Sequence, residues 1–277
     1  YDTSFGWRFI NPKMHEMYGT DGMGVTAENL VDIHKISRED QDAFAYKSQM
    51  KATKAQNKGR LAKEIIEVHI PQRKKNPISF KNDEFIKPQT KPEILAKLRA
   101  AFRKDGSVTA GNSSGLNDGA IATIIASDDA IEKYSLKPKA KILSSAVVGV
   151  EPKIMGIGPV EASNKALKKA GLSLADMDII ELNEAFAAQS LACIRAWGLD
   201  DDDPRINPNG GAIAIGHPPT HQQKIRFSYN VCWCRSGLCS SNRKGMMLNT
   251  VKSREQSDSG CVGVGQGYAC VIENVNL

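Results

Sequence analysis

Hydrophobic residues in the first hundred positions recur mainly at helical spacing. Between Thr26 and Gly59 they fall three and four residues apart, as on one face of an amphipathic helix. Thr26 and Ser37 are both residue types that cap helices, and Ser37 to Asp40 approximates a capping box. A shorter amphipathic helix is expected over residues 93–102. We therefore predict that this region is largely helical.

Strand-like patterns appear between and after these helices. A strand is expected at residues 65–70, followed by a lysine-rich, proline-punctuated loop over residues 71–92. Further strands are predicted at residues 120–126, 142–150 and 179–182. The first of these follows a polar, glycine-rich loop and is expected to be buried.

Helix boundaries in the second half are marked by capping residues. Ser127 is placed to cap one helix, while Pro159 and Gly171 stand at the start and the stop of another. A further helix is expected from near Asn183 to near Gly198. Strands that alternate with helices of this length favour an α/β fold with a mainly parallel sheet.

The composition is that of an ordinary globular protein. The 277 residues are 41% hydrophobic and 25% charged, enough for one large or two ordinary domains. No apolar run reaches 18 residues, which excludes a membrane-spanning helix in this sequence. The net charge is +6, with the densest basic run at Arg73–Lys75. Without a nucleic-acid-binding motif, this charge favours a solvated surface or a site for the phosphates of a nucleotide-like ligand.

The six cysteines do not suggest a disulfide framework, so a reducing, cytoplasmic location is expected. Cys193 lies in an apolar helical pattern, where a buried free thiol is usual. A zinc site is an alternative for one unusual segment. The spacing of its candidate ligands is not that of common zinc knuckles, and we predict no metal. Those ligands would be His221, Cys232, Cys234 and Cys239.

A first chemical motif, Asn183 to Gln189, places Asn183 and Glu184 at a predicted strand-to-helix junction. In parallel α/β folds, ligands bind at the carboxyl ends of strands. An Asn amide there can hold a water or a carbonyl, but Asn is also a good N-cap. On this motif alone, the two functions of Asn183 are equally favoured.

A second motif, Asn207 to Pro218, brackets a predicted small-residue strand with glycines and ends in His217. The glycines permit a close backbone approach to a ligand or a positive φ. A neutral imidazole at His217 can lower the pKa of a thiol or donate to a developing oxyanion. A hydrogen-bonded histidine in a turn is the commoner alternative.

A third motif, Cys261 to Gly267, sets a thiol beside glycines. Such a thiol can shuttle a proton, and a glycine amide can donate to an oxyanion. By itself the motif is also compatible with a glycine-rich strand that happens to contain a cysteine.

In this order, the three motifs resemble the thiolase family. The match of NEAFAAQ followed by NPNGGAIAIGHP is long and has few interchangeable positions. Supporting matches are TAENL at 26–30, TAGNSSGLNDGA at 109–120 and the turn at 155–159. The resemblance covers residues 1–218 almost continuously and resumes near Gly260. Segments at 1–8 and 200–205 are similar to 3-oxoadipyl-CoA thiolases.

The resemblance implies an α/β, thiolase-like fold with mixed sheets flanked by helices and an incomplete first domain. Residues 1–106 would form the CoA-binding loop domain. Residues 107–137 would be a remnant of the N-terminal thiolase domain. Residues 138–277 would form the C-terminal thiolase domain, with an atypical segment at 219–258 that has no sustained helical period.

The resemblance also implies an acyltransferase that uses CoA as a substrate and has no bound cofactor. The intact enzyme would convert 3-oxoadipyl-CoA and CoA to succinyl-CoA and acetyl-CoA, through a thioester on a nucleophilic cysteine. It would bind neither nucleic acid nor membrane. A homo-oligomer is typical of the family, and the missing half argues against that assembly for this chain.

Catalytic functions carry over by motif. His217 would activate the nucleophilic cysteine, Cys261 would move the proton at the α-carbon, and Asn183 and the Gly263 amide would serve two oxyanion holes. The remaining assignments concern CoA: Ser114, Met155 and Phe186 would contact its pantetheine, and Arg73 its nucleotide end.

One departure from the family bears on activity. The family's nucleophilic cysteine lies in an N-terminal half that precedes Tyr1, and no cysteine occurs before Cys193. We therefore expect this chain not to turn over substrate, and expect the missing half to leave apolar surface exposed. The alternative is a non-catalytic CoA-binding or dimer-forming remnant. A third possibility, a metal or nucleic-acid module, would rest on the atypical segment.

Overall fold

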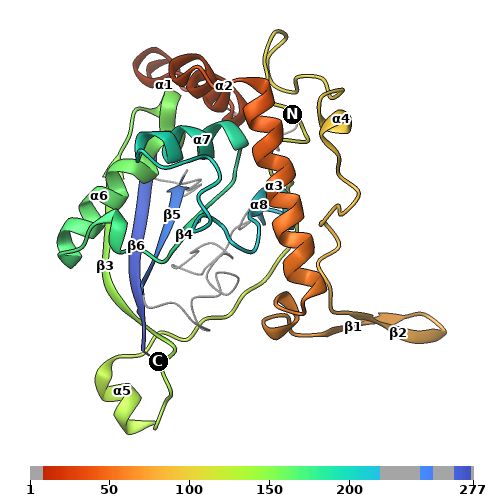
Figure 1. The fold of residues 1–277 in the computed structure, drawn as a ribbon, viewed down its shortest axis with the longest axis vertical. Coiled ribbons are helices and arrows are strands. Elements are labelled where there is room, and N and C mark those ends of the chain that lie inside the picture. The colour runs from red at the N-terminus through yellow and green to blue at the C-terminus, as the bar shows by residue number, and fades with distance from the viewer. Residues whose placement is uncertain (1–8, 219–243, 252–264, 276–277) are drawn as a thin grey trace.

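The computed structural model describes residues 9–218, 244–251 and 265–275. Its centre is a four-stranded sheet covered on one side by helices (Figure 1). The strands follow the order β3 (Ala140–Gly149), β6 (Gln266–Asn274), β5 (Lys244–Val251) and β4 (Ile179–Leu182). β6 is antiparallel to β3 and to β5, while β5 and β4 are parallel. The expected mixed sheet is therefore confirmed, and a mainly parallel one is wrong.

Strand β5 lies within the segment predicted to be irregular. Its residues pair with β4 on one side and with β6 on the other. A short apolar run such as Met246-Met247-Leu248 does not distinguish a strand from a buried helix by its periodicity. The neighbouring strands decide its conformation, because they satisfy the backbone hydrogen-bonding groups on both of its edges.

Helix α6 (Gly158–Ala170) packs against β3 and β6 and buries a stripe that includes Ala162, Ala166 and Leu167. Pro159 lies in its first turn, and Gly171 ends it in the left-handed conformation with φ 67°. Both predicted boundary signals are confirmed. The same core includes α7 (Ala187–Ala196), which contacts α6 and whose residues Leu191 to Ile194 are fully buried.

Two helices form the predicted N-terminal helical region. In α3 (Arg38–Asn57), the Ser37 hydroxyl accepts from the Asp40 amide at 3.0 Å and caps the helix as expected. The expected cap at Thr26 is wrong, because α2 (Met23–His34) already begins at Met23 and the Thr26 hydroxyl donates to the Met23 carbonyl at 2.7 Å. The expected helix over 93–102 shortens to α4 (Pro92–Leu95), since Ala100 pairs with Thr109 in an isolated bridge.

A β-hairpin projects from the end of α3 (Figure 1). It pairs β1 (Val68–Gln72) with β2 (Lys75–Phe80), and Lys74 takes a positive φ of 66° in the turn. The predicted strand is thus shifted by a few residues, and the predicted loop over 71–92 contains a second strand. Pro77 is tolerated in β2 because that strand pairs on one edge only.

The predicted buried strand at 120–126 is wrong. Within the described residues, this segment belongs to no helix or strand, and Ile124 and Ile125 are 87% and 64% exposed. An apolar run forms a strand only where a neighbouring strand satisfies its backbone groups. The two isoleucine side chains therefore form exposed apolar surface.

The remaining elements are short. They are α1 (Pro12–Tyr18), η1 (Leu61–Lys63), α5 (Asp128–Lys133), η2 (Pro152–Ile157), η3 (Leu174–Asp176) and α8 (Ala212–Ile215). Ser127 caps α5 as predicted, because its hydroxyl accepts from the Ala130 amide at 3.3 Å. None of the helices in the described ranges has the length and apolar character required to cross a membrane.

Candidate active site

The first motif begins where strand β4 ends. Asn183 and Glu184 follow the strand directly, and both side chains are buried. Helix α7 begins only at Ala187, with Phe186 at the N-cap position. The predicted helix start at Asn183 is therefore wrong, and so is its alternative function as an N-cap.

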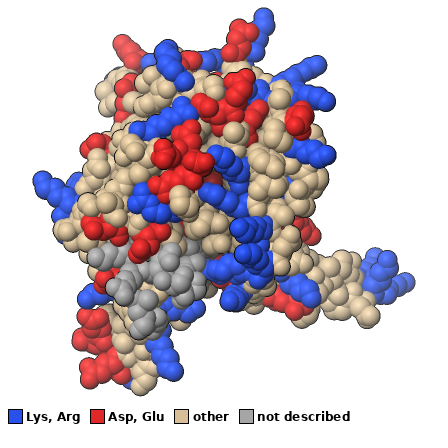
Figure 2. Space-filling view, viewed as in Figure 1, with Lys and Arg blue, Asp and Glu red and all other residues tan. Residues whose placement is uncertain are grey.

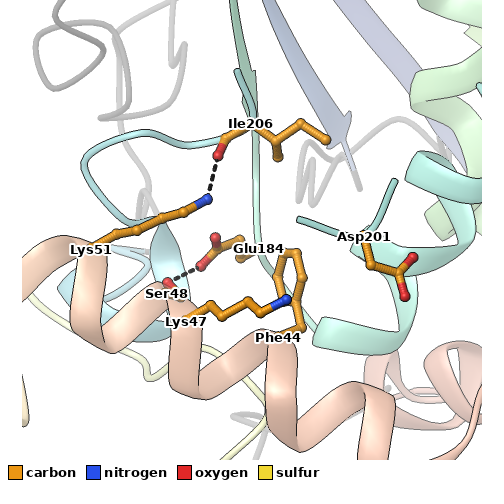
Figure 3. A pocket seen from close by; sticks show the side chains of 7 residues that line it. All are labelled: Phe44, Lys47, Ser48, Lys51, Glu184, Asp201 and Ile206. Atoms are coloured by element: carbon orange, nitrogen blue, oxygen red, sulfur yellow. Dashed lines mark hydrogen bonds between the residues drawn. The ribbon is translucent and has the colours of Figure 1, made fainter. Parts of the chain in front are cut away.

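The Glu184 carboxylate joins the first motif to the second. It accepts a hydrogen bond from the Ser48 hydroxyl at 2.6 Å (Figure 3). It also accepts from the Asn207 side-chain amide at 2.8 Å and the Ile213 backbone N–H at 3.2 Å. Burial raises the pKa of Glu184 above its ordinary value, and its hydrogen bonds and the charge of Lys51 offset only part of this rise. The sequence marked Glu184 only as a polar residue at a junction and gave no signal for Ser48 as its partner.

Asn207 connects the second motif to strand β4. Its side-chain amide donates to the Leu182 carbonyl at 2.8 Å, and its side-chain oxygen accepts from the Leu182 amide at 2.8 Å. The side chain thus occupies the position of a paired strand at the edge of the sheet. Asn tolerates the positive φ of 43° found here better than most residues.

The chain before His217 is helical. The predicted small-residue strand is wrong, because Ala212–Ile215 form the single-turn helix α8. The reason is local: Gly211 accepts hydrogen bonds from the Ala214 and Ile215 amides at 3.0 Å, and Gly216 ends the turn with φ 88°. The predicted need for glycine is confirmed at both ends. At Gly211 a Cβ atom would overlap the Glu184 carboxyl.

The glycine-rich loop at 111–119 contacts both motifs. The Ser114 amide and hydroxyl donate to the Ala185 carbonyl at 3.0 and 3.1 Å. The His217 amide donates to the Gly115 carbonyl at 3.1 Å. The Asn112 carbonyl also accepts from the first amide of α7, that of Ala187, at 2.9 Å. The loop therefore holds the backbone of His217 and the backbone just after Asn183 in fixed relation.

His217 is largely withdrawn from water, and this burial lowers its pKa below the ordinary value of 6.5. Burial disfavours the charged imidazolium. The side chain is therefore a neutral imidazole near pH 7, the form that can accept a proton from a thiol or donate one to an oxygen.

The other predicted site residues that the structure describes lie in separate elements. Met155 is buried in η2, and Phe186 packs edge-on against Phe102 with ring centroids 5.7 Å apart. Arg73 lies in the turn of the projecting hairpin, where Figure 2 shows basic side chains at the tip, so the fold does not gather it with Ser114. Cys261 and Gly263 lie outside the described residues, as do the candidate zinc ligands.

A small pocket adjoins Glu184 on the side of α3 (Figure 3). The Lys51 ammonium donates to the Ile206 carbonyl at 2.8 Å, and burial lowers its pKa. Glu181 is buried nearby, and one of its oxygens has no hydrogen-bond partner among the described residues. Neither Asn183 nor His217, the two predicted catalytic residues that the structure describes, lines this pocket, so it differs from the predicted site. Its lining residues are Phe44, Lys47, Ser48, Lys51, Glu184, Asp201 and Ile206.

Sequence comparisons point to one family. The sequence model of the thiolase N-terminal domain matches residues 8–129, and that of the thiolase C-terminal domain matches residues 136–222. A probable acetyl-CoA acyltransferase of Staphylococcus epidermidis is 43% identical, with 100% of this chain and 68% of that protein covered. The chain belongs to the thiolase family.

Within that family, a beta-ketoadipyl-CoA thiolase of Acinetobacter baylyi is 51% identical over 99% of this chain. The chain spans 65% of the length of that relative. The crystal structure of a Bacillus anthracis acetyl-CoA acetyltransferase superposes with a TM-score of 0.79 at 37% identity, covering 99% of this chain and 66% of that one. The thiolase-like α/β fold predicted from the sequence is confirmed.

The two cysteines that the structure describes do not fit the nucleophile expected of a thiolase. Cys193 and Cys270 are both free and buried. Burial raises the pKa of Cys193 to about 12 and also raises that of Cys270. A thiolate is the reactive form, so neither residue is activated. The Cys193 thiol instead donates to the Gly156 carbonyl at 3.3 Å.

Proposed function

We propose that this chain is part of a thiolase-type acyltransferase that acts on 3-oxoadipyl-CoA and CoA, giving succinyl-CoA and acetyl-CoA. The observation that carries the proposal is the pairing of one loop with both motifs, which holds the neutral His217 beside the chain that carries Asn183. The printed name of the Acinetobacter baylyi relative supports the substrate.

Each of the predicted catalytic residues has its own function in the proposed reaction. His217 takes the proton of the nucleophilic thiol and donates to the thioester oxygen. Asn183 positions a water for one oxyanion, and the Gly263 amide serves the other. Cys261 exchanges the proton at the α-carbon. The functions of Cys261 and Gly263 rest on the motif alone.

CoA would lie along the glycine-rich loop. Ser114 lies where that loop meets Ala185. Met155 and Phe186 belong to neighbouring segments, since Gly156 packs against Gln189 of α7. Arg73 would reach the nucleotide end of CoA from the hairpin. We also propose a cytoplasmic location, because the described cysteines are free thiols. A homo-oligomer, typical of the family, remains a prediction.

Calorimetry with CoA, followed by hydrogen–deuterium exchange, tests this site. We expect CoA to bind the 277-residue polypeptide and to protect residues 112–117 and 153–157, while α5 serves as an internal control. A lack of binding, or protection confined to other segments, would contradict the proposal. We expect no acetyl-CoA to form from 3-oxoadipyl-CoA and CoA, because neither described cysteine is an activated nucleophile.

A binding-only function is the second candidate, favoured by the inactive state of Cys193 and Cys270. It predicts that the polypeptide co-elutes with the intact Acinetobacter baylyi thiolase in size-exclusion chromatography. Separate elution, together with measurable turnover, would exclude it.

A further inference from the structure

We propose that Glu184 is a positioning residue for the proposed active site. Its carboxylate holds the chain just after β4, which carries Asn183, at a set distance from the chain that leads to His217. This inference rests on the proposed function, which makes Asn183 and His217 parts of one active site. The positioning of the two segments by Glu184 can be tested independently of that function.

Three separate elements converge on this one carboxylate. Ser48 comes from α3, Asn207 from the loop after α7, and Ile213 from α8. Glu184 is the residue after Asn183, and Ile213 lies four positions before His217. A displacement of the carboxylate therefore moves the backbone on both sides of the proposed site.

The hydrogen-bond donors around Glu184 favour a carboxylate over an amide. All three partners donate hydrogen bonds to Glu184. A carboxylate is an acceptor only and satisfies all of them, whereas an amide in its place would turn an NH2 group toward a donor. A buried donor without an acceptor is costly.

The backbone is shaped around this carboxylate. A Cβ atom at Gly211 would overlap it, and the Gly211 amide donates to the Ser48 hydroxyl at 3.1 Å. Ser48 thus donates to Glu184 and accepts from the loop beside it. Rigid support of this kind, behind residues that contact substrate, is what keeps a site in its productive geometry.

Glu184→Gln preserves the shape of the side chain and changes only its hydrogen bonding. We expect the Gly211 and Ile213 amides to exchange with deuterium about tenfold faster or more than in the unchanged protein. We also expect the His217 ring resonances to move in the NMR spectrum. The matched control is Ser144→Ala, which removes a hydrogen bond of 2.7 Å to Ala166 at β3 and α6.

A merely structural function would accelerate exchange in both variants in proportion to their loss of global stability. It would leave the His217 resonances unchanged. That result, or unchanged exchange at Gly211 and Ile213 in Glu184→Gln, would overturn the proposal. Ser48→Ala keeps the carboxylate but removes one of its donors and the acceptor of the Gly211 amide. We expect it to give the same changes at Ile213 and at the His217 ring to a smaller extent, and these two readouts decide the question if Glu184→Gln does not fold.

Calorimetry with CoA on the same proteins separates the two proposals. Failure of the unchanged protein to bind CoA would refute the proposed function, while the exchange and NMR results would still decide whether Glu184 positions the two segments. Binding that is weaker in Glu184→Gln but intact in Ser144→Ala would support both.

Discussion

The backbone amide of His217 donates to the carbonyl oxygen of Gly115 at 3.1 Å, although 102 positions separate the two residues (217 − 115). The next loop residue, Leu116, pairs with His217 in an isolated parallel bridge. His217 therefore takes its position from a distant glycine-rich loop as well as from its own motif. Changes in that loop should therefore act on the histidine.

Gly216→Ala should destabilise the protein more than Gly171→Ala. Both glycines have a positive φ, 88° and 67°, but Gly216 lies in a region almost reserved for glycine, with ψ 161°. A Cβ atom there would also overlap the Asn117 carboxamide, whereas Gly171 faces open space. We expect an extra loss of about 1–3 kcal/mol from overpacking. Urea unfolding of both variants measures this difference, and equal losses would contradict the prediction.

Glu181→Gln should flatten the dependence of stability on pH. Burial, followed by the charge of Glu184, raises the pKa of Glu181 from its ordinary value of 4.5 to about 8. The folded protein therefore keeps a proton that the unfolded chain releases above pH 4.5. The stability contributed by neutral Glu181 is complete below pH 4.5 and is lost as the pH rises toward 8.

This loss has a slope of at most about 1.4 kcal/mol per pH unit. Glutamine cannot ionise, so the variant should gain stability relative to the unchanged protein as the pH rises. His217, whose pKa is lowered, contributes equally to both proteins. Denaturant unfolding between pH 5 and 8 measures the difference, and parallel curves would contradict the prediction.

Cys193 should resist alkylation in the native protein. Its pKa of about 12 leaves almost no thiolate near neutral pH, and its side chain is inaccessible to solvent. We expect iodoacetamide to leave the peptide that contains Cys193 unlabelled until the protein is denatured. Peptide mass spectrometry reads this site separately from the other cysteines. Native labelling at the rate of an exposed cysteine would show that the helix opens.

Arg73→Ala should weaken binding of CoA but not of pantetheine. Arg73 is exposed in the hairpin turn and would meet only the phosphate-bearing end of the ligand. An exposed charge pair contributes little, so we expect a loss of no more than about fivefold. Arg99→Ala, at another exposed arginine, is the control. Equal effects on both ligands would remove Arg73 from the nucleotide site.

Local signals in the sequence were sufficient where one segment carries the whole interaction. The cap at Ser37 and the stop at Gly171 each depend on a few neighbouring residues, and each was predicted. The motifs at Asn183 and His217 also identified the family, because their residues are consecutive in the chain.

Interactions between distant segments escaped the sequence for a physical reason. An apolar run becomes a strand only when another strand satisfies its backbone groups. Residues 244–251 pair with a strand on each side. Residues 120–126 pair with no strand among the described residues, although the sequence pattern favoured the opposite outcome.

Glu184 shows the same limit at the site. The sequence by itself determined the thiolase family and the presence of helices between Thr26 and Gly59. The tertiary structure alone decided that a buried carboxylate would collect donors from Ser48, Asn207 and Ile213, and that the loop at Gly115 would hold His217. Hydrogen bonds among distant residues leave no periodic pattern, because they depend on how elements pack and not on spacing within one element.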